Sequence, residues 1–460
     1  MNKIMRLIFL WCLLLSVGTM MGQSSFSLSE AIDYAIQHSP EMQKQAINRA
    51  DADHQIREYK SIGLPKVKGS VSYQYYIATP AQPIQDFITP SVYNVLFQEN
   101  VIPRKDLGTP QTFKFSLFQP NQLSLGLDVN SMLFDGSYIY GLKAIKLLRE
   151  MADKQKDVTE YSIKSQVIKA YVNVLMAKEN LRIIDENLAN LQNSINEVQS
   201  MYKEGFAEFL DVQRMELSIN NLQGEKEKIH SFLAIGKNLL KYQMNYPASE
   251  EIEISDTLKE TIKQLDVQVD ADITSAIIKR PELTLFETSE ALNDLNLKQM
   301  KAGYYPKVNG FASAGASLLR QNLFDNNETG FIPQALVGVS INVPIYDGGD
   351  RKAKMQRIKL TQEKTSLEKS EFLRAVNMQF MNSKSAWKSA KDNLELRRKS
   401  LDTAQSIYDK TLIKYKEGVG SSIEVIQAES LLLQAQSQFT GALYDAVNAG
   451  YEVQTVLGKI

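Results

Sequence analysis

The chain has 460 residues, and its 52 basic and 53 acidic side chains give a formal net charge of −1, a balance that argues against a nucleic-acid-binding protein. Three scattered histidines and a single cysteine, Cys12, offer no set of residues for a metal site or for nucleophilic catalysis. The sequence also lacks a G-x-x-x-x-G-K-S/T phosphate loop, so we expect a protein that is not an enzyme, needs no cofactor and cannot use ATP itself.

Residues 1–22 have the pattern of a secretory signal peptide. Two basic residues precede an apolar run from Leu7 to Val17, and small residues follow it. We expect cleavage after Gly22 or Gly18, and the run is too short to span a membrane as a helix. Cys12 lies inside the run rather than at its end, so a lipid-anchored protein is the less favoured interpretation.

A first repeat is expected at residues 23–245, and it begins with a helical segment at 28–60. Alternating apolar and polar residues then predict two strands, at about 66–78 and 121–134. The stretch 79–120 between these strands holds six prolines and no regular periodicity, and it predicts a long surface loop.

A long helical hairpin completes this repeat. Apolar residues spaced 3-4-3-4 run without a break for five heptads, which predicts a coiled-coil seam. A helix from Leu142 to Lys203 would be about 93 Å long, so it must pack against other long helices. We expect the hairpin to turn near 203–211. The seam residues are Val167, Ala170, Val174, Ala177, Leu181, Ile184, Leu188, Leu191, Ile195, Val198 and Tyr202.

The second half of the chain repeats the first. Residues 202–223 and 415–436 both begin with YKEG, and seven of their 22 aligned positions are identical. HSPEMQ, LPKVKGSV and FDG in the first half are matched by KRPELT, YPKVNGFA and YDGG in the second, in the same order. Such a repeat indicates that one supersecondary unit is used twice.

The second repeat, 273–460, therefore has the same order of elements, and residues 246–272 link it to the first. It predicts a helical segment at 271–302, strands at about 307–318 and 335–346, and a helical hairpin with its tip near 416–424. The seam of the long helix is weaker but stays in register: Phe380, Ser383, Trp387, Ala390, Leu394, Arg397, Leu401, Ala404, Tyr408, Thr411 and Tyr415.

The four alternating runs have the length of tilted strands that cross a bilayer, about 9–12 residues. Alternation also suits a half-buried sheet of a soluble protein, but this chain has no second apolar layer to cover the strands except lipid. Four strands cannot close a barrel, and open edges are not tolerated in lipid, so several copies must share one barrel. The apolar faces are Val67, Val71, Tyr73, Tyr75; Leu123, Leu125, Leu127, Val129; Val308, Ala312, Ala314; and Ala335, Val337, Val339, Ile341.

Over almost the whole mature chain, the duplicated halves, the paired PKV and FDG/YDGG segments, the two Y-x-x-G turns and the final VLGKI resemble the TolC-type outer membrane efflux proteins. The resemblance implies a mixed α/β membrane protein: a homotrimer that shares a twelve-stranded β-barrel in the outer membrane of a Gram-negative bacterium. Its coiled-coil helices would form a periplasmic α-helical barrel, with an equatorial region that includes 246–272.

By function, the resemblance implies the passive outer channel of a tripartite efflux or type I secretion system, gated at the helix tips. Its partners would be outer membrane lipid, a periplasmic adaptor and an inner-membrane pump of RND or ABC type. The main alternative is a periplasmic coiled-coil adaptor or a structural protein of an export complex. Adaptors usually have one hairpin between β domains that do not face lipid, so the doubled hairpin and the amphipathic strands argue against it. The final residue, Ile460, is not the aromatic residue that often ends outer membrane barrels, which is a point against the channel.

The YKEG turns then become the candidate gate. Gly205 and Gly418 suit a positive φ at the end of a helix. The resemblance places a narrowing of the tunnel at Glu424 and Gln427, where this chain keeps one acid and replaces another by an amide. Three carboxylates around a threefold axis would attract cations; the competing interpretation of Glu424 is a solvated acid on the surface of a helix.

Tyr415 and Asp211 match positions that tie neighbouring coils shut in the resembling family. The basic partner that the resemblance implies two residues after Gly418 is Gly420 here. The familiar salt bridge is therefore expected to be absent or built differently, and the closed state to be held more weakly.

A second set of candidate turns lies where strands lead into helices. Asp135 and Asp347 are expected to cap helices or close turns. Gly136, Gly348 and Gly349 would permit the bend after each aspartate.

Overall fold

The computed structural model describes residues 24–116, 118–265, 277–278, 280–325 and 330–460. The expected signal peptide with its cleavage site, and residues 266–272 of the expected linker, lie outside these ranges. The chain divides into two compact units. A helical unit runs up to Asp53, from Leu147 to Leu292 and from Leu360 to Ile460, and a sheet unit contains His54–Lys146 and Asn293–Lys359.

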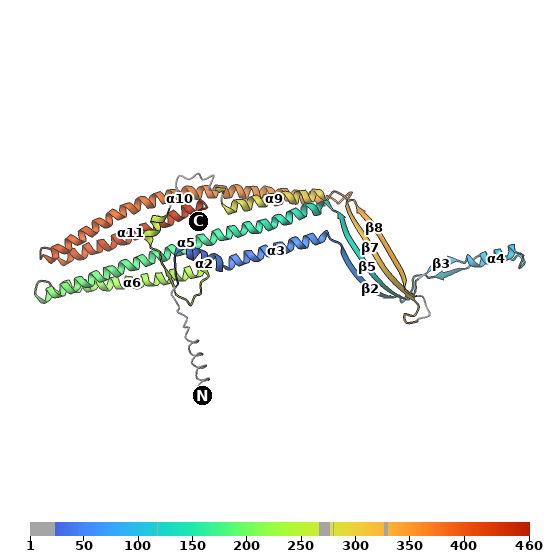
Figure 1. The fold of residues 1–460 in the computed structure, drawn as a ribbon, viewed down its shortest axis with the longest axis horizontal. Coiled ribbons are helices and arrows are strands. Elements are labelled where there is room, and N and C mark those ends of the chain that lie inside the picture. The colour runs from blue at the N-terminus through green and yellow to red at the C-terminus, as the bar shows by residue number, and fades with distance from the viewer. Residues whose placement is uncertain (1–23, 117, 266–276, 279, 326–329) are drawn as a thin grey trace, which may run out of the picture. The chain divides into compact units, whose positions relative to one another are not determined.

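Long helices make up most of the chain (Figure 1). Among the described residues, no helix combines the length and the apolar character needed to cross a bilayer. The helices outside the 79–120 stretch are α2 (Leu28–His38), α3 (Pro40–Ile62), α5 (Gly136–Lys203), α6 (Phe209–Met244), α7 (Leu258–Gln264), α9 (Pro281–Ala302), α10 (Asp350–Lys416) and α11 (Ser422–Val456).

The expected single helix at 28–60 is wrong in one respect, because it breaks between α2 and α3. Ser39 lies between the two helices, and its Oγ accepts hydrogen bonds from the backbone N of Glu41 at 3.1 Å and of Met42 at 3.4 Å. Pro40 takes the first position of α3, where its missing N–H costs nothing. A local N-cap therefore starts a new helix.

The seams of α5 and α10 are buried as predicted. All residues of the first seam are buried or half-buried except Tyr202, which is 45 % exposed. All residues of the second seam are buried or half-buried. Two short strands belong to the helical unit as well. β1 (Ser24–Phe26) pairs in parallel with β6 (Ile252–Ile254), and β6 lies inside the expected linker 246–272.

The sheet unit holds one antiparallel sheet in the order β2 (Lys66–Tyr75), β5 (Asn121–Phe134), β7 (Lys307–Arg320) and β8 (Ile332–Asn342). The four predicted strands are all present, but β2 ends earlier than 78 and β8 covers 332–342 instead of 335–346. Pro344 has no N–H to donate to a ladder, which accounts for the early end of β8.

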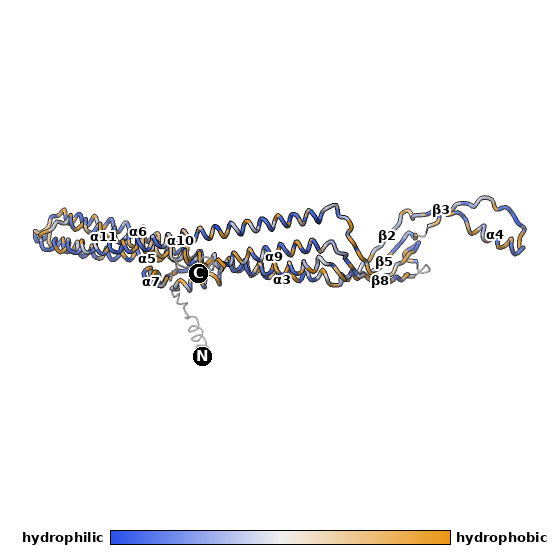
Figure 2. Tube along the Cα trace, turned by 90° about the horizontal axis from the view of Figure 1, so that it is seen from above, coloured by the Kyte–Doolittle hydropathy of each residue, from blue (hydrophilic) through white to orange (hydrophobic). Residues whose placement is uncertain are grey.

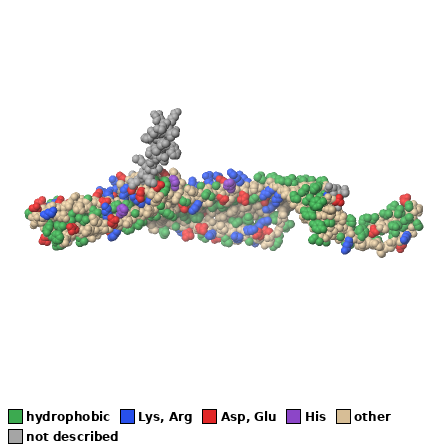
Figure 3. Space-filling view, turned by 90° about the horizontal axis from the view of Figure 1, so that it is seen from below, with side chains coloured by type: hydrophobic (Ala, Val, Ile, Leu, Met, Phe, Trp, Pro, Cys, Tyr) green, Lys and Arg blue, Asp and Glu red, His purple; other side chains and the backbone are tan. Residues whose placement is uncertain are grey.

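The register places the predicted apolar residues on one face. Val129 pairs with Ala312, and Ala312 with Val337, so one apolar row crosses three strands. In the single chain this face is uncovered: Val71 is 75 % exposed and Val337 is 84 % exposed. Figure 3 shows the hydrophobic side chains gathered over the strands. A strand slipped by one residue would turn its apolar set to the opposite face, so the register is well specified.

The prediction of a plain loop at 79–120 is wrong. The segment contains a hairpin of β3 (Gln82–Gln85) and β4 (Thr112–Phe115), and between them the helix α4 (Ile88–Gln98). The Asp86 carboxylate accepts hydrogen bonds from the backbone N of Ile88 and Thr89, at 3.1 and 2.9 Å, and so starts the helix. These elements are too short to show a period in the sequence.

Gly315 is expected to be essential for the pairing of β5 with β7. It lies opposite Gly126, and a Cβ at Gly315 would stand 2.4 Å from the backbone oxygen of Leu125, which cannot move without breaking the ladder. Gly315→Ala should destabilise the sheet by about 1–2 kcal/mol, measured as a lower midpoint temperature of thermal unfolding. Gly69→Ala is the matched control, because nothing lies within 4 Å of its Cβ position; equal losses in both variants would contradict the argument.

Candidate functional site

Two helix–helix turns form the core of the candidate site, one from α5 to α6 and one from α10 to α11. Gly205 has a φ of 80° and Gly418 a φ of 75°, so the predicted positive φ values are confirmed. Each turn closes in the same way: Phe206 N donates to Met201 O at 2.8 Å, and Val419 N to Lys414 O at 3.0 Å. The repeat in the sequence is thus a repeat in backbone geometry.

Gly420 serves the second turn in another way. It is absent from the residues with a positive φ among those described. A Cβ at this position would lie 3.1 Å from Tyr415 N and 3.3 Å from the Cβ of Lys414. A glycine is therefore favoured here because the chain passes close to the end of α10, rather than because of an unusual backbone angle.

Asp211 connects the two hairpins. Its Oδ1 accepts a hydrogen bond from Ser422 Oγ at the start of α11, and lies 3.6 Å from Arg214 Nη1. Arg214 Nη1 is in turn 3.4 Å from Ser422 Oγ. The Oδ2 of Asp211 accepts a hydrogen bond from Glu208 N at 3.1 Å, which caps α6. The Asp211 side chain, which is 15 % exposed, thus both caps the N-terminus of α6 and forms the contact between the hairpins.

The cation beside Asp211 comes from the first hairpin rather than from the second. The sequence has a glycine where a basic residue was expected in the second hairpin, and Arg214 lies three residues after Asp211 on α6 instead. Ser422 and Arg214 were not among the predicted site residues. The spacing of Arg214 could have suggested an ion pair with Asp211, because residues three apart on a helix are neighbours. Nothing in the sequence pointed to Ser422 as the partner of Asp211.

Tyr415 lies beneath this contact. It is 7 % exposed and packs in the same apolar cluster as Val212 and Val425. Burial, together with the nearby charge of Asp211, raises the pKa of the Tyr415 phenol. Within the described part of the chain its hydroxyl has no hydrogen-bond partner. The structure therefore brings Tyr415 and Asp211 together, and the tie to a neighbouring coil stays a prediction.

Glu424 and Gln427 lie one turn apart on the exposed face of α11. The backbone N of Glu424 donates to Ser421 Oγ at 3.4 Å, so Glu424 belongs to the first turn of the helix. A shared exposed face is compatible with a ring around an axis and with simple solvation. The role of both residues in a narrowing of the tunnel remains a prediction.

Glu429 is a residue of interest that the sequence reasoning missed. It is 6 % exposed, and burial raises the pKa of its carboxyl to about 7. Its counterpart in the first repeat, Glu216, is exposed. The signal was available: Glu429 stands in a 3-4-3 spacing with Ser422, Val425 and Leu432, all of which are buried.

The aspartates at the strand–helix turns have the predicted capping role. Asp135 Oδ1 accepts a hydrogen bond from Ser137 N at 2.8 Å, and Asp135 also forms an ion pair with Lys307 at 2.9 Å. Asp347 Oδ1 accepts from Gly349 N at 3.1 Å. Gly348 and Gly349 have φ values of 65° and 87°, which confirms the bend after Asp347.

The prediction for Gly136 is wrong. It is the first residue of α5 and does not have the positive φ of a bend. A Cβ at this position would lie 3.3 Å from Ala302 O and 3.4 Å from the ring of Tyr305. The glycine thus allows the start of α5 to approach the end of α9.

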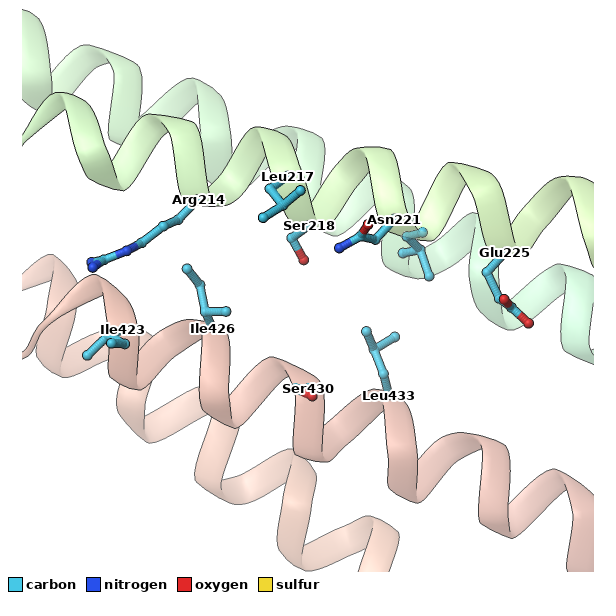
Figure 4. Close-up of a pocket in the computed structure, with 10 residues that line it drawn as sticks. Arg214, Leu217, Ser218, Asn221, Glu225, Ile423, Ile426, Ser430 and Leu433 are labelled. Atoms are coloured by element: carbon cyan, nitrogen blue, oxygen red, sulfur yellow. The ribbon is translucent and has the colours of Figure 1, made fainter.

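A groove runs between α6 and α11 next to the Asp211 contact (Figure 4), with a volume of 460 Å³. Side chains of the two helices point toward each other across it. Leu217, Ile426 and Leu433 give it an apolar lining, and Arg214 and Glu225 stand at its two ends.

In the described residues, no group of three His, Cys, Asp or Glu side chains is placed to hold a metal ion.

The sequence profile of the outer membrane efflux protein family matches residues 31–228 and 273–459. The toluene efflux pump outer membrane protein TtgF of Pseudomonas putida is 22 % identical over 310 residues, which cover 67 % of this chain and 62 % of TtgF. The cation efflux system protein CusC of Escherichia coli is 21 % identical over 302 residues, or 64 % of this chain and 63 % of CusC. The chain thus spans less than two thirds of the length of these curated relatives.

Solved structures show the same fold. The crystal structure of CusC has a TM-score of 0.72 at 15 % identity, over 95 % of this chain and 92 % of CusC. The open state of the Neisseria gonorrhoeae outer membrane channel MtrE has a TM-score of 0.70 at 17 % identity, over 94 % of this chain and 88 % of MtrE. The arrangement of four strands and two long hairpins is therefore a known fold.

Proposed function

The chain belongs to the outer membrane efflux protein family, and on this premise we propose that it is the passive outer membrane channel of an export system. It carries substrates from the periplasm or from an inner-membrane pump to the outside of a Gram-negative cell. The observation that supports this best is the sheet: its apolar face is exposed, no further strand among the described residues pairs with its edge strands β2 and β8, and it continues into two long helical hairpins.

The directions of the strands favour closure by identical copies. β2 and β7 run one way, and β5 and β8 run the other way. The two edge strands, β2 and β8, are thus antiparallel to each other, and β8 of one copy can pair with β2 of the next as all other neighbours do. Three copies, the number that the family resemblance implies, give a twelve-stranded barrel with the apolar face toward lipid.

The helical hairpins of the two repeats, 23–245 and 273–460, then form the wall of a periplasmic tunnel, with the linker 246–272 in its equatorial region. The energy for transport comes from an inner-membrane pump of RND or ABC type, coupled through a periplasmic adaptor. The groove between α6 and α11 suits an adaptor helix, because an apolar stripe would meet Leu217 and Leu433 and charges would meet Arg214 and Glu225.

TtgF is named for toluene and CusC for cations, and the same tunnel would serve either cargo or a secreted protein. The neighbouring genes discriminate between the systems: a proton-driven pump with its adaptor indicates small-molecule efflux, and an ABC transporter with a protease domain indicates protein secretion.

The proposed channel is tested on the full chain expressed in a Gram-negative host. We expect trimers in the outer membrane fraction, shown by chemical cross-linking and by the mass of the detergent-solubilised complex. The purified protein should conduct ions in planar bilayers. Recovery only as a soluble periplasmic monomer would falsify the proposal and favour the adaptor or structural protein instead.

Glu424→Ala tests the proposed narrowing of the tunnel. Three Glu424 carboxylates near a threefold axis attract cations, so the variant should lose part of its preference for cations and its block by multivalent cations. The measurement is the reversal potential in a salt gradient, with and without a trivalent cation. Gln427→Ala, an uncharged neighbour on the same face, should keep the selectivity. An unchanged profile in Glu424→Ala would remove this residue from the conducting path.

A further inference from the structure

The segment 76–120, here called the extension, is apolar and uncovered. α4 has no buried residue, and Phe87, Val95 and Val101 are 64 %, 57 % and 64 % exposed. At its root the two arms of the extension are hydrogen-bonded to each other: Tyr76 N donates to Pro120 O at 2.8 Å, and Ser116 Oγ to Pro80 O at 2.8 Å. Figure 2 shows hydrophobic residues along α4. The two arms of the extension are thus tied together, but none of the described residues buries the apolar side chains of α4.

Water is a poor environment for such a segment. α4 has 11 residues and contains no Asp, Glu, Lys or Arg. Helices of this length are marginal on their own, and so is a two-stranded hairpin such as β3–β4. The α4 side chains Val92 and Val95 are nevertheless 51 % and 57 % exposed, and apolar side chains exposed together usually mark a contact surface. Something must cover α4 in the working protein.

The position of the extension indicates what covers it. It leaves the sheet between Tyr75 and Asn121, a directly paired couple at the ends of β2 and β5. β2 is an edge strand, so in a shared barrel the extension stands at the seam with the next copy. The second connection at this end of the sheet, residues 321–331, is short. Each copy thus brings one long projection to the rim of the barrel.

We propose that the extensions of the three copies cover one another, with their α4 helices packed together as a cap over the mouth of the barrel. This inference rests on the trimer of the proposed function. Charge permits the contact, because residues 79–120 contain three acidic and three basic side chains and α4 contains none. Lipid is the weaker candidate, because helices that lie on membranes carry Lys or Arg on a polar face, and α4 has neither.

Single cysteines in a Cys12→Ala background test the cap in outer membrane vesicles. Val95→Cys in α4 should form disulfide-linked dimers on mild oxidation, since one bond per trimer joins two of the three copies. Val92→Cys, also exposed in α4, is the second position in case the first variant assembles poorly. Lys114→Cys in β4 is the control, because its exposed side chain lies outside α4. The two α4 variants should form disulfides several-fold faster than the control, because packed α4 helices hold their cysteines at a high effective concentration.

The mass of the solubilised complex separates failure of the proposed cap from failure of the proposed trimeric channel. A trimer with cross-linked α4 cysteines supports the cap. A trimer in which the cysteines at 92 and 95 stay uncross-linked overturns the cap but not the channel. In that case, quenching of a fluorophore on Val95→Cys by nitroxide lipids indicates that lipid covers α4. Free reaction of the Val95→Cys thiol with a water-soluble maleimide indicates that α4 is exposed to water. Absence of a trimer removes the basis of both proposals.

Discussion

Glu429→Gln should stabilise the contact of α11 with its neighbours at neutral pH and remove most of its pH dependence. Glu429 is 6 % exposed, and burial raises its carboxyl pKa from the ordinary 4.5 to about 7. Near it lies the phenol of Tyr408, whose own pKa is raised by burial and by the negative charges of Glu429, Asp409 and Glu197. The environment of Glu429 is thus one of burial away from water, which favours the protonated acid.

The sign of the effect follows from proton linkage. Below about pH 4.5 the acid is protonated in both the folded and the unfolded chain, and its ionisation has no influence on stability. As the pH rises from 4.5 toward 7, the unfolded chain releases a proton that the folded chain retains, so the free energy of unfolding falls. The loss levels off above pH 7, at about 3 kcal/mol. Glutamine keeps the size of the side chain and does not ionise.

Hydrogen exchange of the amides around Glu429, corrected for the intrinsic pH dependence, measures this effect in the assembled protein. Protection should fall between pH 4.5 and pH 7 in the wild type, level off above pH 7, and stay nearly constant in Glu429→Gln. Glu216→Gln is the matched control from the other repeat, because Glu216 is exposed. Equal protection of wild type and Glu429→Gln at pH 8 would show that another group, such as a cation from a neighbouring copy, compensates the charge.

Asp211→Ala should loosen the helix tips. It removes the acceptor of the Ser422 hydroxyl, the partner of Arg214 and the cap of Glu208 N together. Arg214 would be left without its carboxylate beside Ser422. Hydrogen bonds to a largely buried carboxylate and the loss of a cap together correspond to about 3 kcal/mol.

Single-channel recordings measure the consequence. If the contact holds the tips together in the resting channel, Asp211→Ala should show higher conductance or a larger open fraction, and Asp211→Asn, which keeps an acceptor, a smaller change. Glu204→Ala removes an exposed acid from the same turn and serves as the control. A wild-type conductance in Asp211→Ala would mean that the contact between the hairpins has no part in gating.

Much of the fold could be predicted from the sequence because its elements are long and periodic. The seam of α5 and the apolar faces of the strands repeat often enough to fix which side of each element is buried. The extension escaped prediction because β3, α4 and β4 are only four, 11 and four residues long. Gly136 was misjudged because a glycine next to a turn can serve either a bend or a close approach.

The candidate site shows where sequence reasoning stops. The positive φ at Gly205 and Gly418 is a local property and was predicted. The hydrogen bond between Asp211 and Ser422 joins residues 211 positions apart, and no local pattern states which residues of two hairpins meet. Burial of Glu429 depends on the packing of several helices, although its spacing on α11 gave a hint.

The even number of strands determines which segments of the chain are exposed outside the cell in the proposed channel. The chain enters β2 at Lys66 and leaves β8 at Asn342 at the same end of the sheet. Only the segments 76–120 and 321–331 connect strands at the other end. In the proposed channel these two segments are the parts that must be translocated during insertion, and they are the regions that an antibody, a phage or an external protease would meet first.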